Sequence, residues 1–213
     1  NNWVTTTGEV DESDVAHFDR VLEWARKHGL GVVLAMHGLP GYRNGIRYGA
    51  AETDVGSPFT DDATRGDAAY LWWLVAKRYV DIGAQLRFEL LASPNAESAE
   101  QIRLFNAEMI ASIRRVDRDR MVYVTSRNMR IEHVADVVFG DANTALVLRM
   151  REPEIFTVQF DPRIPRIRFP GTVPDLAAVL GSDAPEAIHS KRVLSIDSFN
   201  AYVDEFARKA RET

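Results

Sequence analysis

The 213-residue chain contains no cysteine, and no apolar run in it approaches the ~18 residues that a membrane-spanning helix needs. The absence of cysteine excludes disulfides and thiolate chemistry. No Gly-x-Gly-x-x-Gly, phosphate-loop or His-Glu-x-x-His pattern occurs, so we expect no cofactor and no metal. Lysine is scarce, and its helical or polar contexts disfavour a Schiff-base lysine in a pocket. The lysines are Lys27, Lys77, Lys191 and Lys209.

What is present is the composition of an ordinary globular protein, with 46% hydrophobic residues, 27% charged residues and a net charge of -5. Basic residues are interspersed with acidic ones, so we expect no nucleic-acid partner. The lack of a long apolar run likewise predicts no membrane partner. The first seven residues do not have the charged-then-apolar layout of a signal peptide, and the residues alone assign no localisation.

Strand and helix patterns alternate along the chain, which is typical of parallel βαβ units. Apolar residues at helical spacing predict helices at 11–28, 67–80, 97–116, 131–139 and 195–211. Short apolar runs predict buried strands at 31–36, 87–93, 121–125 and 145–150. A polar loop is expected at 42–65. We therefore expect an α/β fold with about four parallel strands and flanking helices. Trp72 or Trp73 belongs to an apolar stripe on the 67–80 helix, which indicates core and not a ligand site.

The strand at 87–93 carries the candidate site. Pro94 cannot donate a ladder hydrogen bond, so the strand should end there. Side chains at the carboxyl end of such a strand point into the active-site mouth of barrels and open α/β sheets, and here they are Ala92 and Ser93. Glu89 shares strand parity with Ser93 and should point inward below it. It is either a base for proton abstraction or, as we favour, a structural carboxylate paired with Arg87 or another arginine.

Several motifs stand in one consistent order along the chain. VLAMHGLPG at 33–41 resembles a third-strand motif, Asp-Leu-His-Gly-Ala-Pro-Gly, and FELLASPN at 88–95 resembles a fourth-strand motif, Phe-Glu-Leu-Leu-Asn-Glu-Pro-Asn. Residues 118–128 are similar to the fifth strand of the same enzymes. LRMREP at 148–153 with FTVQ at 156–159 resembles the sixth-strand Phe-His-Tyr-Tyr-Glu-Pro and Phe-Thr-His-Gln. The chain thus resembles the cellulase-type, endoglucanase-like enzymes of glycoside hydrolase family five.

This resemblance implies a partial TIM barrel of the (β/α)₈ type, a single domain over residues 1–213 that lacks the family's first two and last two strands. It also implies a retaining glycosidase, whose two carboxyl groups lie about 5–5.5 Å apart across the scissile bond. The acid/base Glu falls on Ser93, and the nucleophile strand would begin after Thr213. The family is usually secreted. An open sheet would expose its edges, so we also expect self-association or a complementary chain.

The resemblance places the altered catalytic position at Ser93 and implies substrate-binding positions at His37, Ala92, Arg149, Tyr42 and Asn128. His37 would contact a sugar hydroxyl or be satisfied by a neighbouring backbone group. Arg149 would attract a carboxylate or phosphate, or serve as a structural partner of Glu89. A Ser93–His37 pair for acyl transfer lacks an evident orienting group and oxyanion hole, so a small residue that merely empties the pocket is the favoured interpretation.

The residues and the resemblance are compatible with three alternatives, of which two assign the chain a function, and they do not by themselves make it an enzyme. One is a cellulase-type barrel, inactive or greatly weakened toward β-glucosides, that binds an oligo- or polysaccharide in its mouth. The other is an engineered or repurposed scaffold with a cleared apolar pocket for a small molecule or a new reaction. The second rests on small or apolar residues where the family is polar, at Ala35, Ala92, Ser93 and Val158. A fragment without activity of its own is the third alternative.

Overall fold

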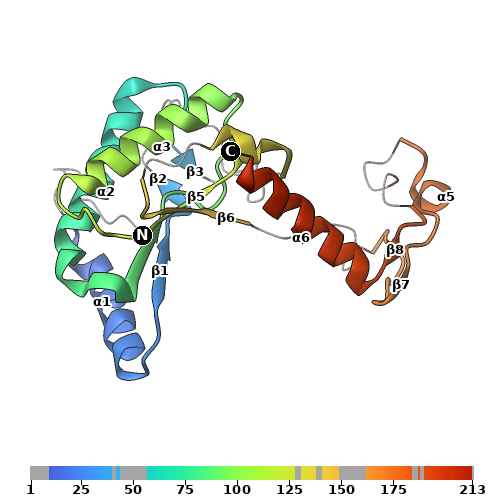
Figure 1. Ribbon diagram of the computed structural model, residues 1–213, viewed down its shortest axis with the longest axis horizontal. Coiled ribbons are helices and arrows are strands. Elements are labelled where there is room, and N and C mark those ends of the chain that lie inside the picture. Colours follow the sequence, from blue (N-terminus) through green and yellow to red (C-terminus); the bar gives the residue numbers. More distant parts are fainter. Residues whose placement is uncertain are drawn as a thin grey trace. The chain divides into compact units, whose positions relative to one another are not determined.

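The computed structural model describes residues 10–39, 42–43, 57–127, 131–137, 141–148, 162–183, 187 and 190–212. The chain divides into two compact units, Asn1–Leu148 with Thr213, and Arg149–Glu212 (Figure 1). The single barrel-type domain expected over 1–213 remains a prediction. In the described part of the chain, no helix combines the length and the apolarity that crossing a membrane requires.

The first unit is built on a parallel sheet with the strand order β1-β4-β5-β6. Its strands are β1 (Val32–Ala35), β4 (Leu86–Glu89), β5 (Val122–Thr125) and β6 (Thr144–Val147). All neighbouring pairs run parallel. The α/β class with four parallel strands, predicted from the alternation of patterns, is confirmed.

The register of the strands shows which residues share each face of this sheet. Leu34 lies opposite Phe88, Phe88 opposite Val122, and Val122 opposite Thr144. These four residues are all buried, and the Phe88 ring lies 5.2 Å from that of Trp72 on a covering helix. The next row, which contains Glu89, points to the other face because successive side chains alternate. One face therefore carries the core and the other carries the inward-pointing candidate residues.

Each of the three α-helices described in the first unit begins at a residue whose side chain accepts a hydrogen bond from a backbone N–H group of the first turn. In α1 (Glu12–Lys27) the Asp11 carboxylate accepts from Ser13 and Asp14, as expected for an N-cap. In α3 (Ala99–Arg114) Ser98 and Gln101 form a capping box. In α2 (Asp62–Tyr79) Asp61 caps Thr64, so this helix begins five residues before the predicted start at 67. Apolar periodicity does not reveal this beginning, because the first turn is polar and Gly66 follows it.

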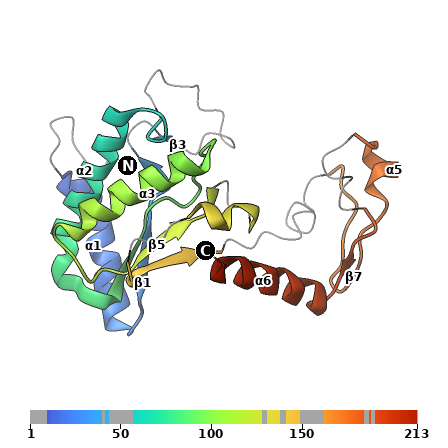
Figure 2. The same ribbon diagram turned by 45° about the horizontal axis from the view of Figure 1, so that its top comes forward.

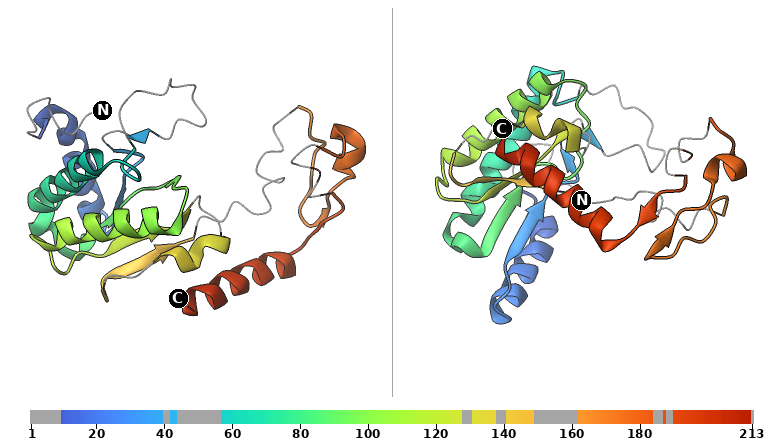
Figure 3. Two further views of the ribbon diagram at one scale, coloured as in Figure 1. Left: turned by 90° about the horizontal axis from the view of Figure 1, so that it is seen from above. Right: turned by 45° about the vertical axis from the view of Figure 1, so that its right-hand side comes forward.

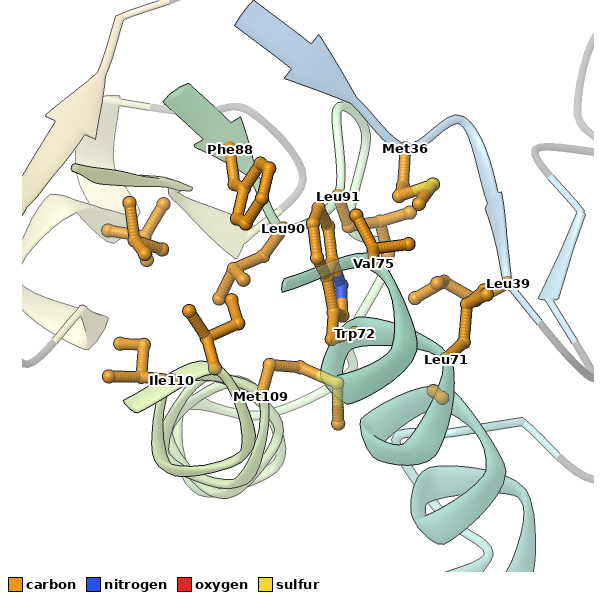
Figure 4. Close-up of a cluster of buried hydrophobic side chains, with 14 of the residues drawn as sticks. Met36, Leu39, Leu71, Trp72, Val75, Phe88, Leu90, Leu91, Met109 and Ile110 are labelled. Atoms are coloured by element: carbon orange, nitrogen blue, oxygen red, sulfur yellow. The ribbon is translucent and has the colours of Figure 1, made fainter. Parts of the chain in front are cut away.

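Helices α2 and α3 lie side by side on one face of the sheet (Figure 2). They enclose a core in which Trp72, Phe88, Phe105, Met109 and Ile113 are fully buried. Figure 4 shows Trp72, Phe88 and Met109 in this core. Burying side chains of this size stabilises the fold by about 1.5–3 kcal/mol each relative to exposure. The edge-on contact between Phe18 of α1 and Tyr79 of α2, with ring centroids 5.5 Å apart, joins α1 to the same core.

The remaining elements are short connectors and the second unit. In the first unit they are the antiparallel pair β2 (Gly38–Leu39) and β3 (Tyr42–Arg43), with the 3-10 helices η2 (Val80–Gln85) and η4 (Ile131–Asp136). The second unit contains β7 (Gly171–Thr172), α5 (Leu176–Leu180), β8 (Val193–Leu194) and α6 (Ile196–Arg211). Helix α6 follows β8 without interruption (Figure 3), and Ser195 caps it as the predicted range 195–211 requires.

Candidate functional site

The candidate site is the carboxyl edge of the parallel sheet. Because the strands are parallel, the residues that follow β1, β4 and β5 emerge at this one edge. His37 follows β1, Ser93 follows β4 and Ser126 follows β5. Strands β1 and β4 are hydrogen-bonded neighbours. The two sequence candidates His37 and Ser93 therefore lie beyond the ends of adjacent strands, as predicted.

Backbone hydrogen bonds continue past the strand ends and hold Ala92 beside β1. The Met36 N–H donates to the Glu89 carbonyl at 3.2 Å, and the Ala92 N–H donates to the Met36 carbonyl at 2.8 Å. Ala92 is fully buried and Ser93 is 8% exposed, whereas His37 is exposed. The methyl and hydroxyl side chains are thus packed into the sheet edge, and the imidazole is the group presented to solvent.

Tyr42 ties the hairpin after His37 to the strand that carries Ser93. Its hydroxyl donates to the Ser93 carbonyl oxygen at 2.7 Å. Its ring packs edge-on against Phe59, with centroids 5.4 Å apart. Burial raises the pKa of the Tyr42 hydroxyl above its usual value, so the hydroxyl keeps its proton and remains a donor at neutral pH. The substrate contact expected of Tyr42 stays a prediction, and its hydroxyl already serves a backbone acceptor.

Glu89 is a buried carboxylate on the inward face of β4. Thr125, buried on the neighbouring strand β5, donates its hydroxyl to Glu89 Oε1 at 3.0 Å. Arg87, the arginine expected to pair with Glu89, is exposed. The structure thus gives Glu89 a hydroxyl partner within the sheet, and its pairing with an arginine stays a prediction. Sequence reasoning missed Thr125 and Ser126, although a polar pair that directly follows an apolar run is the signal that would have found them.

A charged cluster flanks the edge beyond β5. The Nε atom of Arg127 lies 2.9 Å from Asp136 Oδ2, and Nη1 of Arg127 donates to the Glu97 carbonyl at 3.1 Å. The Nδ1 atom of His133 lies 3.3 Å from the same Asp136 oxygen. Arg127 therefore joins the segment after β4 to η4 through side-chain and backbone acceptors. Sequence reasoning assigned His133 no role, although its partner Asp136 lies only three residues further along the chain.

Asn128, Arg149 and Val158 lie outside the described residues. Within the described ranges, no group of three or more His, Asp or Glu side chains is placed to hold a metal ion. At this edge the chain thus offers an exposed imidazole, two small buried side chains and a carboxylate engaged by a threonine.

A family model described as cellulase (glycosyl hydrolase family 5) matches residues 1–157. Endoglucanase C of Acetivibrio thermocellus is 29% identical over 134 residues, which are 61% of this chain and 37% of the relative. An endoglucanase of Clostridium sp. (strain F1) matches with the same identity and coverage. The match thus spans little more than a third of the length of these curated relatives.

Solved structures agree on the fold. A glycoside hydrolase superposes with a TM-score of 0.71 at 17% identity, over 100% of this chain and 60% of that one. The cellulose synthase subunit Z of Clostridioides difficile gives 0.68 at 17% identity, over 99% and 62%. Endoglucanase Cel5A of Thermotoga maritima gives 0.64 at 19% identity, over 97% and 60%. The parallel sheet and its helices are the corresponding part of a TIM barrel, and the chain belongs to glycosyl hydrolase family 5, the cellulase family.

Proposed function

We propose that this chain is a cellulase-type barrel that binds β-linked oligosaccharide but hydrolyses β-glucosides weakly or not at all. The observation that carries the proposal is the segment that follows β4. Where the family pattern has Asn-Glu before proline, this chain has Ala92 and Ser93, and both are buried in the sheet edge beside β1.

The chemistry of retaining hydrolysis explains the expected loss. One carboxyl group must protonate the leaving oxygen and then act as base toward water. A glutamate has an ordinary pKa of about 4.3, which its surroundings can raise toward the working pH. The alcohol of Ser93 is far too weak an acid to donate a proton in this way. Loss of a general acid lowers the rate by about 10²–10⁴-fold.

The nature of the ligand is proposed from the relatives. Thermotoga maritima Cel5A has been solved with cellobiose and with mannotriose, and a hyperthermophilic endo-β-1,4-glucanase has been solved with its substrate. By analogy, the mouth of this chain would take a β-linked oligosaccharide. Its contacts would include His37, the exposed side chain at the edge, together with the predicted positions Tyr42, Arg149 and Asn128.

The test combines binding and turnover on the same protein. Calorimetric titration with cellohexaose should show binding that His37→Ala weakens. Chromatography of the mixture should show the cellohexaose intact, and an aryl β-cellobioside should release no aryl alcohol. Ser93→Ala is the matched control, because removal of a hydroxyl without catalytic function should change neither result.

Two outcomes would contradict this proposal. Sustained hydrolysis that disappears in Glu89→Gln would show that a second carboxylate does the chemistry. Hydrolysis that disappears in Ser93→Ala would assign a catalytic role to the hydroxyl. The alternative of a repurposed scaffold with a cleared pocket has weaker support, because Ala92 is fully buried and lines no open space. Soaking with small aromatic compounds would test it, and bound density at Ala92 would favour the scaffold.

A further inference from the structure

The surface shared by α2 and α3, on the side turned away from the sheet, contains a groove of about 640 Å³. Its floor is made of small residues, among them Gly66, Ala69 and Ala111. Ser112 donates its hydroxyl to the Ala69 carbonyl at 2.7 Å and fixes the spacing of the two helices. A Cβ added at Gly66 would meet nothing within 4 Å, so the hollow is open at that end. The groove is built from two rigid helices and is separate from the strand ends described above.

One wall of the groove is an ordered aromatic pair. The rings of Tyr70 and Trp73 stack with centroids 5.7 Å apart and planes inclined by 20°. Lys77 Nζ lies over the Trp73 ring, 4.9 Å from its centroid, and this cation–π contact helps to fix the ring. Tyr70 is nevertheless 47% exposed. Aromatic side chains that are already ordered lose little conformational entropy when a ligand packs against them, so the wall is prepared for contact.

The opposite side of the groove supplies one charge of each sign. Glu108 is held in place by Arg65, whose Nε atom lies 3.0 Å from Glu108 Oε1. Arg115 is exposed, and its guanidinium makes no hydrogen bond or ion pair with the described residues. The groove therefore combines the Glu108 carboxylate as a hydrogen-bond acceptor, the Arg115 guanidinium as a donor and the flat surface of the aromatic rings. Ligand sites typically combine mainly apolar walls with a few placed polar groups.

We infer that this groove is a second carbohydrate-binding site that takes an oligosaccharide of pyranose units. A pyranose ring presents an apolar C–H face, which packs against Tyr70, and hydroxyls that both donate and accept. Glu108 accepts from these hydroxyls and Arg115 donates to them. A phosphate would be repelled by Glu108, and a wholly apolar ligand would bury both charges without partners. The inference does not depend on the catalytic state of Ser93.

The first test removes the aromatic wall. In titrations with cellohexaose, Tyr70→Ala and Trp73→Ala should each lower the association constant of one class of sites at least about fivefold, as expected for loss of an aromatic contact. The matched control is Trp24→Ala, because Trp24 lies on α1, is 61% exposed and does not line the groove. This control and His37→Ala should leave the groove sites unchanged.

The second test fills the groove without removing a contact. A Cβ added at Gly66 meets nothing within 4 Å, and Gly66→Leu replaces a glycine inside a helix, so the variant should fold at least as well as the parent. It should also lose the groove sites. This variant separates lost binding from lost folding, since its melting temperature should stay the same or rise.

Three results would overturn the inference. They are an unchanged titration for both Tyr70→Ala and Trp73→Ala, an equal loss in Trp24→Ala, and full binding in Gly66→Leu. A fourth result, loss of all binding in His37→Ala alone, would also overturn the inference and would leave the mouth site of the proposed function standing. Hydrolysis of cellohexaose would contradict the proposed function but would leave the groove inference standing.

Discussion

The buried guanidinium of Arg120 joins four segments of the first unit. Its Nε atom donates to Asp117 at 2.8 Å, and Nη2 donates to the Tyr79 carbonyl at 2.7 Å. Nη1 donates to the carbonyls of Gly83 and Leu86. The end of α2, η2 and the start of β4 thus share one cation. Since these carbonyls lie 34 to 41 residues before Arg120 in the chain, only folding gives Arg120 this role.

We predict that Arg120→Met lowers the free energy of unfolding by about 3–5 kcal/mol, because it leaves Asp117 as a buried charge without its partner. Urea denaturation followed by circular dichroism measures the change. Arg118→Met, at an exposed arginine in the same loop, is the control and should shift stability by no more than about 0.5 kcal/mol. Similar losses in the two variants would contradict the assignment.

Asp141 gives a prediction for pH. Arg114 donates to it through Nε at 2.5 Å and Nη2 at 3.0 Å, which holds the pKa of the carboxyl below its ordinary value of 3.8. The folded state thus binds this proton less readily than the unfolded chain does. The stabilisation is present above about pH 4 and is lost as the pH falls through the lowered value.

Asp141→Asn should therefore cost about 1 kcal/mol at pH 7, a value kept small because the carboxylate is partly exposed. The difference between variant and parent should shrink as the pH is lowered below 4. Denaturation curves at several pH values measure it. A difference that stays constant between pH 7 and pH 2 would refute the ion-pair explanation.

At the scale of elements, α2 contains a glycine that its conformation does not require. Gly66 lies inside the helix, and a Cβ there meets nothing within 4 Å. We predict that Gly66→Ala stabilises the protein by about 0.5–1 kcal/mol, since glycine is the poorer helix former. Gly29, which follows α1 with a φ of 66°, is the matched contrast. Gly29→Ala should destabilise, because a Cβ is strained at positive φ.

The β2–β3 hairpin gives a second prediction at this scale. Tyr42→Phe keeps the ring against Phe59 but removes the hydroxyl that donates to the Ser93 carbonyl. We expect a loss of about 1 kcal/mol and faster amide exchange in the Leu90–Ser93 segment, measured by mass spectrometry. Unchanged exchange there would mean that the hairpin does not support the strand end.

At the scale of the whole molecule, the described sheet ends in two edge strands, β1 and β6. Val33 on β1 is 44% exposed, and an exposed apolar edge favours pairing with another chain. We predict self-association, measured by size-exclusion chromatography with light scattering. Val33→Lys should weaken it, because a charge at an edge opposes pairing. A stable monomer at all concentrations would contradict the prediction.

Much of the secondary structure could be predicted from the sequence. Short apolar runs predicted all four strands of the sheet, but β4 ends at Glu89, four residues before the expected end at 93. Asp11 and Ser195 marked the beginnings of their helices correctly. The motif around residues 88–95 led to the family that the comparison confirmed. The start of α2 was predicted five residues late, because its first turn is polar and the cap, Asp61, lies in what read as loop.

The sequence by itself determined most of the local structure and the chemical identity of the segment after β4, where Ala92 and Ser93 stand before Pro94. These depend on backbone propensity and on residue type, which act over a few positions. The tertiary structure decided which neighbouring side chain is buried: Trp72 has 0% exposure in the core, whereas Trp73 lines the outer groove. It also joined Tyr42 to Ser93 and Thr125 to Glu89. Such contacts link residues dozens of positions apart, and they form only when the strands and helices pack.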